Sequence, residues 1–82
     1  MARVRTIAQS VRDLAGGRDR FEVDAPTVRA LLDELERRHP GLGRHVRESM
    51  TVAVDGELHH EGWDIALRPD SEVILVPALV GG

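Results

Sequence analysis

The sequence has 82 residues, which suits one domain with a small core, because a chain of this length buries only about 60% of the surface that it exposes when unfolded. Hydrophobic residues make up 41% and charged residues 30% of the chain, which argues against disorder. The formal net charge of -3 argues against a protein held to nucleic acid by electrostatic attraction. No stretch resembles a membrane span or the apolar core of a signal peptide, so we expect a cytoplasmic protein.

The absence of cysteine and of lysine limits the chemistry of this chain. The sequence has no cysteine, so its side chains can form no disulfide, carry no persulfide and supply no thiolate to zinc. All 11 basic residues are arginines, so no lysine is present either. Conjugation onto this protein through an amine is therefore limited to its N-terminus.

The first part of the chain predicts two paired strands. Residues 2–8 alternate in polarity and predict a strand, although Ile7 falls among the polar positions and does not fit the pattern. Residues 9–14 predict a short helical turn that a pair of glycines ends. Residues 20–24 alternate cleanly, and we expect them to pair antiparallel with the first strand.

Residues 28–38 predict the main helix. Thr27 is the expected N-cap, and the sequence His-Pro-Gly at 39–41 is expected to end the helix. Four apolar residues fall at the spacing of one helical face, namely Val28, Leu31, Leu32 and Leu35. The rest of the helix surface carries charged side chains, so we expect a single buried face. No further element is predicted before residue 50.

The last part of the chain predicts three more strands. Residues 50–54 alternate toward Asp55-Gly56, a dipeptide suited to a tight hairpin turn, and a brief strand through Leu58 can pair back. Trp63 is expected to be partly buried. Residues 72–76 form the longest β-branched run, which is typical of a central strand buried on both faces.

This order of elements predicts an α+β fold. One helix can cover several strands only if a mixed sheet wraps over it, with the last strand beside the first. That is the layout of a β-grasp, or ubiquitin-like, domain. We therefore expect residues 1–82 to form a single β-grasp domain with a flexible C-terminal tail at 77–82.

The residues also resemble a known family. In this order, the segments AQSVRDLAGG, PTVRALLDEL, VAVDGE and LRPDSEVILVPALVGG are similar to the MoaD, ThiS and CysO-type bacterial sulfur carriers. The resemblance covers nearly the whole chain. It implies a carrier or cosubstrate protein, or a non-catalytic small subunit of a sulfur-transferring synthase, and not an enzyme.

The resemblance further implies the chemistry of the C-terminus. An adenylating enzyme of the MoeB/ThiF type, using ATP and magnesium, would activate the carboxylate of Gly82. A sulfurtransferase or another sulfur source would then convert it to a thiocarboxylate, and a sulfur-accepting synthase would use that sulfur. The product would be molybdopterin, cysteine or a sulfur-containing metabolite. No cofactor is expected on this chain itself.

The C-terminal residues suit that role physically. Gly81 and Gly82 lack Cβ atoms and can pass through a narrow channel. Pro77 lacks an N–H group, so we expect sheet pairing to end near Val76, and residues 77–82 can span roughly 20 Å when extended. The expected partner-binding residues are Val76, Pro77, Ala78, Leu79, Val80 and Gly81.

Two other functions stay open. The chain can be a ubiquitin-like modifier that is joined through Gly82 to lysines of other proteins, or an interaction domain with an inert tail. A metal site is not expected, because His59 and His60 are adjacent on an extended segment and point to opposite faces. His39 is interpreted as a helix-end residue and His45 as a loop or surface residue.

Overall fold

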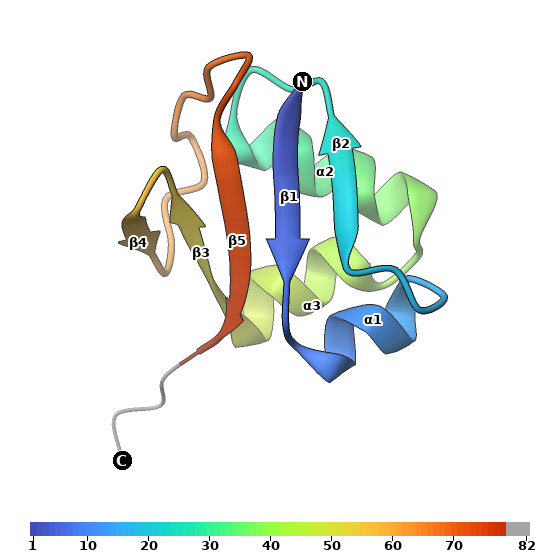
Figure 1. Ribbon diagram of the computed structural model, residues 1–82. Helices are drawn as coiled ribbons and strands as arrows, with labels where there is room; N and C mark the ends of the chain where they lie inside the picture. The colour runs from blue at the N-terminus through green and yellow to red at the C-terminus, as the bar shows by residue number, and fades with distance from the viewer. Residues whose placement is uncertain (79–82) are drawn as a thin grey trace.

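The computed structural model describes residues 1–78 as one sheet with helices on one side (Figure 1). The strands are β1 (Ala2–Thr6), β2 (Arg20–Val23), β3 (Met50–Val54), β4 (Glu57–His59) and β5 (Glu72–Pro77), and the helices are α1 (Gln9–Leu14), α2 (Val28–Arg38) and α3 (Leu42–Ser49). Figure 1 shows α2 and α3 behind the sheet, and no helix of residues 1–78 lies over its front. No helix within residues 1–78 has the length and hydropathy that crossing a membrane requires.

The sheet is mixed, and β5 lies at its centre. The strand order is β2-β1-β5-β3-β4. β5 runs parallel to β1, with Val4 opposite Val73, and antiparallel to β3, with Val52 opposite Leu75. β2 and β4 are the antiparallel edge strands. The predicted placement of the last strand beside the first is confirmed, and the architecture is the β-grasp layout that the sequence predicts.

The core lies between the sheet and α2. The four apolar residues that the helical spacing predicts to be buried, Val28, Leu31, Leu32 and Leu35, are all fully buried. The side-chain oxygen of Thr27 accepts a hydrogen bond from the N–H of Ala30 at 3.2 Å, so Thr27 is the N-cap as predicted. His39 is the C-cap residue. The interpretation of residues 28–38 as the main helix is therefore confirmed.

The segment before β5 fastens the start of α2. The N–H groups of Val28 and Arg29 donate to the carbonyls of Ile65 and Trp63 at 3.0 and 2.7 Å. The Arg29 guanidinium also pairs with Asp64 at 2.8 Å. A carbonyl partner for each of these N–H groups satisfies donors that a helix start leaves free. Trp63 is half-buried against the core, as expected.

The expectation that β5 is buried on both faces is wrong. Val73 and Leu75 are fully buried under the helices, but Ile74 and Val76, which point to the other side of the sheet, are only half-buried. A continuous apolar run is typical of two-sided burial, yet here only one face has a helical cover (Figure 1). The apolar side chains on the second face are left for another use.

The structure also contains a helix that the sequence patterns did not predict. α3 follows directly on Gly41, whose backbone is left-handed with φ of 95°. Glu36 of α2 caps it, because its carboxylate accepts hydrogen bonds from the N–H groups of Gly41 at 2.6 Å and Arg44 at 3.0 Å. His45 therefore lies on a helix and not in a loop, with its Nε2 2.9 Å from Ser10 Oγ.

We predict that Gly43→Ala destabilises the protein. A Cβ at this position would lie 2.5 Å from the carbonyl oxygen of Leu32 and 2.9 Å from Cβ of Glu36, so α2 and α3 would have to move apart. The expected loss is about 1 to 3 kcal/mol in the free energy of unfolding, measured by urea denaturation. Arg44→Ala, at the next and exposed position, is the control and should change it by only about 0.5 kcal/mol.

We also predict that Glu36 makes stability depend on acid pH. Hydrogen bonds from the N–H groups of Gly41 and then Arg44 hold the pKa of Glu36 below its ordinary value of 4.5. The stabilisation is complete above that value and is lost as the pH falls through the lower folded-state pKa. Glu36→Gln should therefore lose less stability than the wild type between neutral and acid pH. Equal pH profiles would contradict the cap, and Glu48→Gln serves as the control.

Candidate functional site

The end of β5 is where the structure meets the predicted binding residues. β5 continues through Pro77, which lies opposite Met50, and the N–H of Ala78 donates to the carbonyl of Ser49 at 3.3 Å. Pairing with β3 therefore extends past Val76, and the predicted start of the tail at 77 is too early. Val76 and Ala78 are half-buried, while Pro77 is exposed.

Strand alternation explains why Pro77 fits in this central strand. The hydrogen bonds from Asp55 to Glu72 and from Ala78 to Ser49 place the even-numbered residues of β5 toward β3. The backbone nitrogen of Pro77 then points to the side of β1, whose pairing with β5 ends at Leu75. The missing N–H group costs no hydrogen bond of the sheet, so proline is tolerated here.

The remaining predicted site residues lie outside the described part of the chain. These residues are Leu79, Val80, Gly81 and Gly82. The structure does give the anchor that precedes them, which is β5: it pairs with both β1 and β3 through Leu75, and with β3 alone at Val76 and Pro77.

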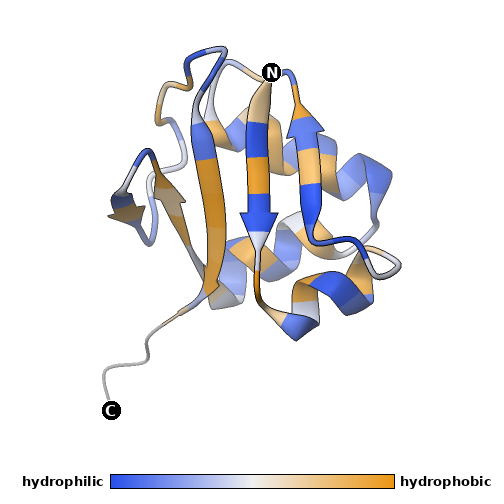
Figure 2. Cartoon of the chain, viewed as in Figure 1, coloured by the Kyte–Doolittle hydropathy of each residue, from blue (hydrophilic) through white to orange (hydrophobic). Residues whose placement is uncertain are grey.

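The front of the sheet carries an apolar surface that includes the outward-facing residues of β5. We name it the open-face strip, and its residues are Ile7, Leu58, Ile74 and Val76. Ile7 is 83% exposed and Leu58 59%, which is unusual for large aliphatic side chains. In Figure 2, β5 is hydrophobic along most of its length, whereas β1 and β2 alternate.

The strand register makes the strip continuous. Leu58 lies opposite Ala53, and Ala53 lies opposite Ile74, so one cross-strand row joins β4, β3 and β5. Ile74 and Ile7 line the same shallow hollow of about 310 Å³. The strip therefore crosses the front of the sheet from β4 to the end of β1, and Val76 continues it toward the C-terminal anchor.

The sequence patterns did not identify this strip as a site, although they contained a signal. Ile7 was the one residue that did not fit the alternation of the first strand. The unbroken apolar run that contains Ile74 and Val76 was interpreted as buried on both faces. Apolar residues in polar positions of adjacent strands predict an exposed apolar surface once the strands are known to share a face.

Two hydrogen bonds join the turn between β3 and β4 to the start of β5. In one of them, the N–H of Asp55 donates to the carbonyl of Glu72 at 2.9 Å. Asp55, in a left-handed conformation with φ of 48°, accepts a hydrogen bond from the N–H of Glu72 at 2.9 Å. That bond lowers the pKa of the Asp55 carboxyl, with help from Ser71 and Arg68. The start of β5 is thus fixed to the turn of the neighbouring hairpin.

The histidines form no metal site within residues 1–78. No group of three or more histidine, aspartate and glutamate side chains there is arranged to hold a metal ion. His60 Nδ1 lies 3.0 Å from Thr51 Oγ1, and the ring of His39 packs edge-on against Phe21 with centroids 5.6 Å apart. His60 and His39 thus have protein partners, whereas the buried Nε2 of His59 has no hydrogen-bond partner among the described residues.

We predict that Ile7 is dispensable for folding. Because its side chain is 83% exposed, Ile7→Ser should change the free energy of unfolding by only about 0.5 kcal/mol. Leu35→Ala, in the fully buried face of α2, should cost about 2 to 5 kcal/mol through loss of packing and formation of a cavity. Urea denaturation of both variants makes the comparison. A loss for Ile7→Ser as large as that for Leu35→Ala would show that Ile7 belongs to the core.

Comparison with solved structures finds the same fold. The CysO chain of the Amycolatopsis orientalis BexX/CysO complex has a TM-score of 0.83 at 23% identity, with 100% of both chains covered. Small archaeal modifier protein 1 from Haloferax volcanii has a TM-score of 0.69 at 28% identity, covering 99% of this chain and 98% of that one. A Pyrococcus furiosus protein described as molybdopterin converting factor subunit 1 has a TM-score of 0.71 at 26% identity, covering 95% and 97%.

Comparison with families gives a match over most of the sequence. A search of curated proteins finds no match. The model of the ThiS family matches residues 6–82, which include β5 and the segment that follows it. The fold agrees, since the neighbours of this structure are ubiquitin-like β-grasp proteins. The chain belongs to the ThiS family.

Proposed function

We propose that this protein is a sulfur carrier that holds sulfur as a thiocarboxylate on Gly82. The observation that carries the proposal is that the family match runs to residue 82 and so includes the Gly81-Gly82 pair. The central position of β5 supports it, because a strand that pairs with β1 and β3 through Leu75 and with β3 on to Pro77 gives the following residues a fixed origin. The protein acts as a cosubstrate in this proposal and performs no catalysis itself.

The proposed reaction has two steps. The Gly82 carboxylate first attacks the α-phosphorus of ATP on a MoeB/ThiF-type enzyme, and pyrophosphate leaves. Hydrosulfide then attacks the carbonyl carbon of the acyl-adenylate, AMP leaves with the C–O electron pair, and loss of a proton gives the thiocarboxylate. If the nucleophile is instead the persulfide of a sulfurtransferase, the product is an acyl disulfide, and a thiol must reduce its S–S bond to release the thiocarboxylate. Adenylation is needed because a free carboxylate resists nucleophilic attack. A sulfurtransferase or another sulfur source supplies the sulfur, and magnesium and ATP are bound by the activating enzyme.

The open-face strip is the proposed docking surface for these partners. Exposed aliphatic side chains on the front of the sheet favour contact with a second protein. Leu79, Val80 and Gly81 would then enter the partner's channel with Gly82, while Val76, Pro77 and Ala78 would contact the partner from the end of β5. A protein of this fold is known in a complex, since the Amycolatopsis orientalis neighbour was solved as BexX with CysO. By analogy, we propose that a synthase receives the sulfur.

The second candidate function is a protein modifier. The observation that favours it is the neighbour named as a small archaeal modifier, at 28% identity. The same activated Gly82 would be attacked by a lysine amine of a target protein instead of by sulfur. The absence of lysine from this chain prevents chains of the protein linked through its own side chains.

Mass spectrometry of the intact protein distinguishes these functions. The full chain, with any affinity tag at its N-terminus, is expressed in its native cells and purified. Replacement of one oxygen by sulfur at Gly82 supports the carrier, whereas an isopeptide bond to another protein supports the modifier. A terminus that is never modified, in cells where the pathway operates, contradicts both.

Two variants test the role of the terminal glycines. Deletion of Gly82 and Gly81→Trp should each abolish thiocarboxylate formation, because the first moves the reacting carbon and the second cannot pass a narrow channel. Both should leave the midpoint of thermal unfolding unchanged. Leu35→Ala is the control with the opposite pattern, since it lowers that midpoint but keeps the reactive terminus. Thiocarboxylate on the truncated chain would contradict the assignment of Gly82.

A further inference from the structure

The arginines of this protein fall into two groups. Six form ion pairs with carboxylates, and they lie on α2, on α3 or in the segment before β5: Arg29, Arg37, Arg38, Arg44, Arg47 and Arg68. The others have no ion-pair partner within residues 1–78, and they lie on β1, on α1 or around β2: Arg3, Arg5, Arg12, Arg18 and Arg20. Arginines without an ion pair therefore gather on one part of the molecule, where Asp13, Asp19, Glu22 and Asp24 also form no ion pair with a described residue.

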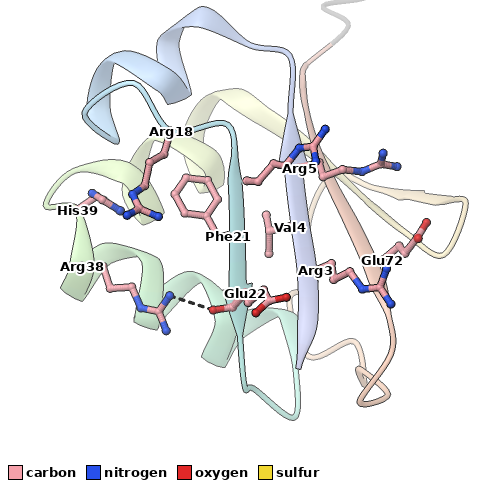
Figure 3. Close-up of a pocket in the computed structure, with 10 residues that line it drawn as sticks. Arg3, Val4, Arg5, Arg18, Phe21, Glu22, Arg38, His39 and Glu72 are labelled. Carbon is pink, nitrogen blue, oxygen red and sulfur yellow. Dashed lines mark hydrogen bonds between the residues drawn. The ribbon is translucent and has the colours of Figure 1, made fainter.

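Most of these arginines surround one hollow. It is open to solvent, has a volume of about 850 Å³ and lies over β1 and β2 (Figure 3). The basic residues that line it are Arg3, Arg5, Arg18, Arg20, Arg38 and His39. Its acidic residues are Glu22 and Glu72, which lie opposite Arg3 on the two neighbouring strands. Arg3 thus has carboxylates beside it. No carboxylate of residues 1–78 lines the other end of the hollow, where Arg5 and Arg18 lie in the upper part of Figure 3.

Arg5 and Arg20 form a like-charge pair within the sheet. They are directly opposite each other in the β1–β2 register, and the neighbour of Arg5 on its other side is Ile74. Like charges in this position destabilise a pair of strands. No described residue forms an ion pair with either of them. The folded protein therefore keeps an unfavourable pair at an exposed position.

This pair borders the open-face strip. Arg5 and Arg20 also line the smaller hollow of about 310 Å³, together with Ile7 and Ile74. Asp19 lies at the same hollow and forms no ion pair with a described residue. An apolar surface with guanidinium groups along one margin is complementary to an apolar surface with carboxylates along its edge.

We propose that Arg5 and Arg20 form a carboxylate-binding patch that docks on the acidic surface of a protein partner, which covers the open-face strip at the same time. Arg18 lies beside His39 on the side of β2 that faces the helices, so it is not part of the patch (Figure 3). The forked guanidinium group matches a carboxylate through two parallel hydrogen bonds. The smaller hollow that Arg5 and Arg20 share with Ile7 and Ile74 is lined by no aromatic ring of residues 1–78 on which a nucleic-acid base could stack. A protein with clustered aspartates and glutamates is therefore the occupant that the chemistry fits.

The patch should affect stability and binding in opposite directions. Arg20→Glu places a carboxylate opposite Arg5, so it should raise the midpoint of thermal unfolding by about 1 to 5 °C. The same variant should weaken binding to an acidic partner. A purely structural role for Arg20 would instead lower the unfolding midpoint. The two readouts together distinguish a surface kept for binding from one kept for folding.

An NMR titration of the full chain tests the ligand chemistry directly. The probe is a hexaglutamate peptide at low ionic strength, and inorganic phosphate and a single-stranded oligothymidylate are the comparisons. We expect the peptide to shift the side-chain Nε–Hε signals of Arg5 and Arg20 and the amide signals of Ile7 and Ile74. Equal shifts over all exposed arginines would overturn the patch. Tighter binding of the oligothymidylate than of the peptide would overturn the assignment to a protein surface.

Charge-matched variants complete the test. The double variant Arg5→Gln and Arg20→Gln should weaken peptide binding about tenfold and reduce its dependence on salt. The control, Arg37→Gln and Arg44→Gln, has the same net charge but changes ion-paired arginines whose side chains are 73% and 78% exposed, and it should bind as the wild type does. Equal weakening in both would show a net-charge effect and would overturn the proposal.

The nature of the partner, an activating enzyme or a synthase, rests on the proposed function, but the patch itself does not. A chain that becomes thiocarboxylated yet fails the peptide titration contradicts the patch alone. A chain that binds the peptide at Arg5 and Arg20 but is never modified contradicts the carrier function alone. If an activating enzyme is identified, the double glutamine variant should raise its KM for the carrier, with kcat unchanged.

Discussion

The parallel contact between β1 and β5 is the constraint on which the rest of the structure depends. The hydroxyl of Thr6 donates to the carbonyl of Leu75 at 2.8 Å, and the N–H of Ala8 donates to the same hydroxyl at 3.0 Å. Thr6 is buried, so loss of these bonds would leave polar groups unpaired in the core. This contact joins the first and last strands of the sequence. The chain between β2 and β3 crosses the sheet on one side, where it forms α2 and α3 (Figure 1). The β1–β5 contact also fixes the place from which the C-terminal residues leave.

The position of the helices on one side follows from that topology and determines what the other side can do. β5 has sheet neighbours on both edges, so its hydrogen bonds are satisfied without any cover on its front. Ile74 and Val76 can then remain partly exposed, because the core is completed by Val73 and Leu75 on the inner face. The stability of the fold and the character of the open face are thus largely separate. Substitutions on the front of the sheet can change binding at little cost in folding.

The sequence predicted most of the fold, since its regular elements carry strong local patterns. The alternation in β1 and β2 and the apolar face of α2 each identify an element from a few consecutive residues. α3 was missed because its start depends on Glu36, a side chain of the preceding helix, and on the left-handed backbone of Gly41. Its spacing of Leu42, Val46 and Met50 was the available signal.

The candidate site was harder to predict, because it depends on facts that a strand does not carry in its own residues. A run such as Val73 to Val76 reads the same whether helices cover one face of the sheet or two. The identity of the covered face decides whether Ile74 is core or surface, and only the placement of α2 and α3 behind the sheet settles it (Figure 1). The strand register likewise decides that Arg5 faces Arg20. Arginines that look evenly spread in the sequence thus fall into two groups in the fold: ion-paired arginines lie on and near the helices, and arginines without ion pairs lie around β1 and β2. The covered face explains the apolar character of the front of the sheet, and the strand register explains its charged margin.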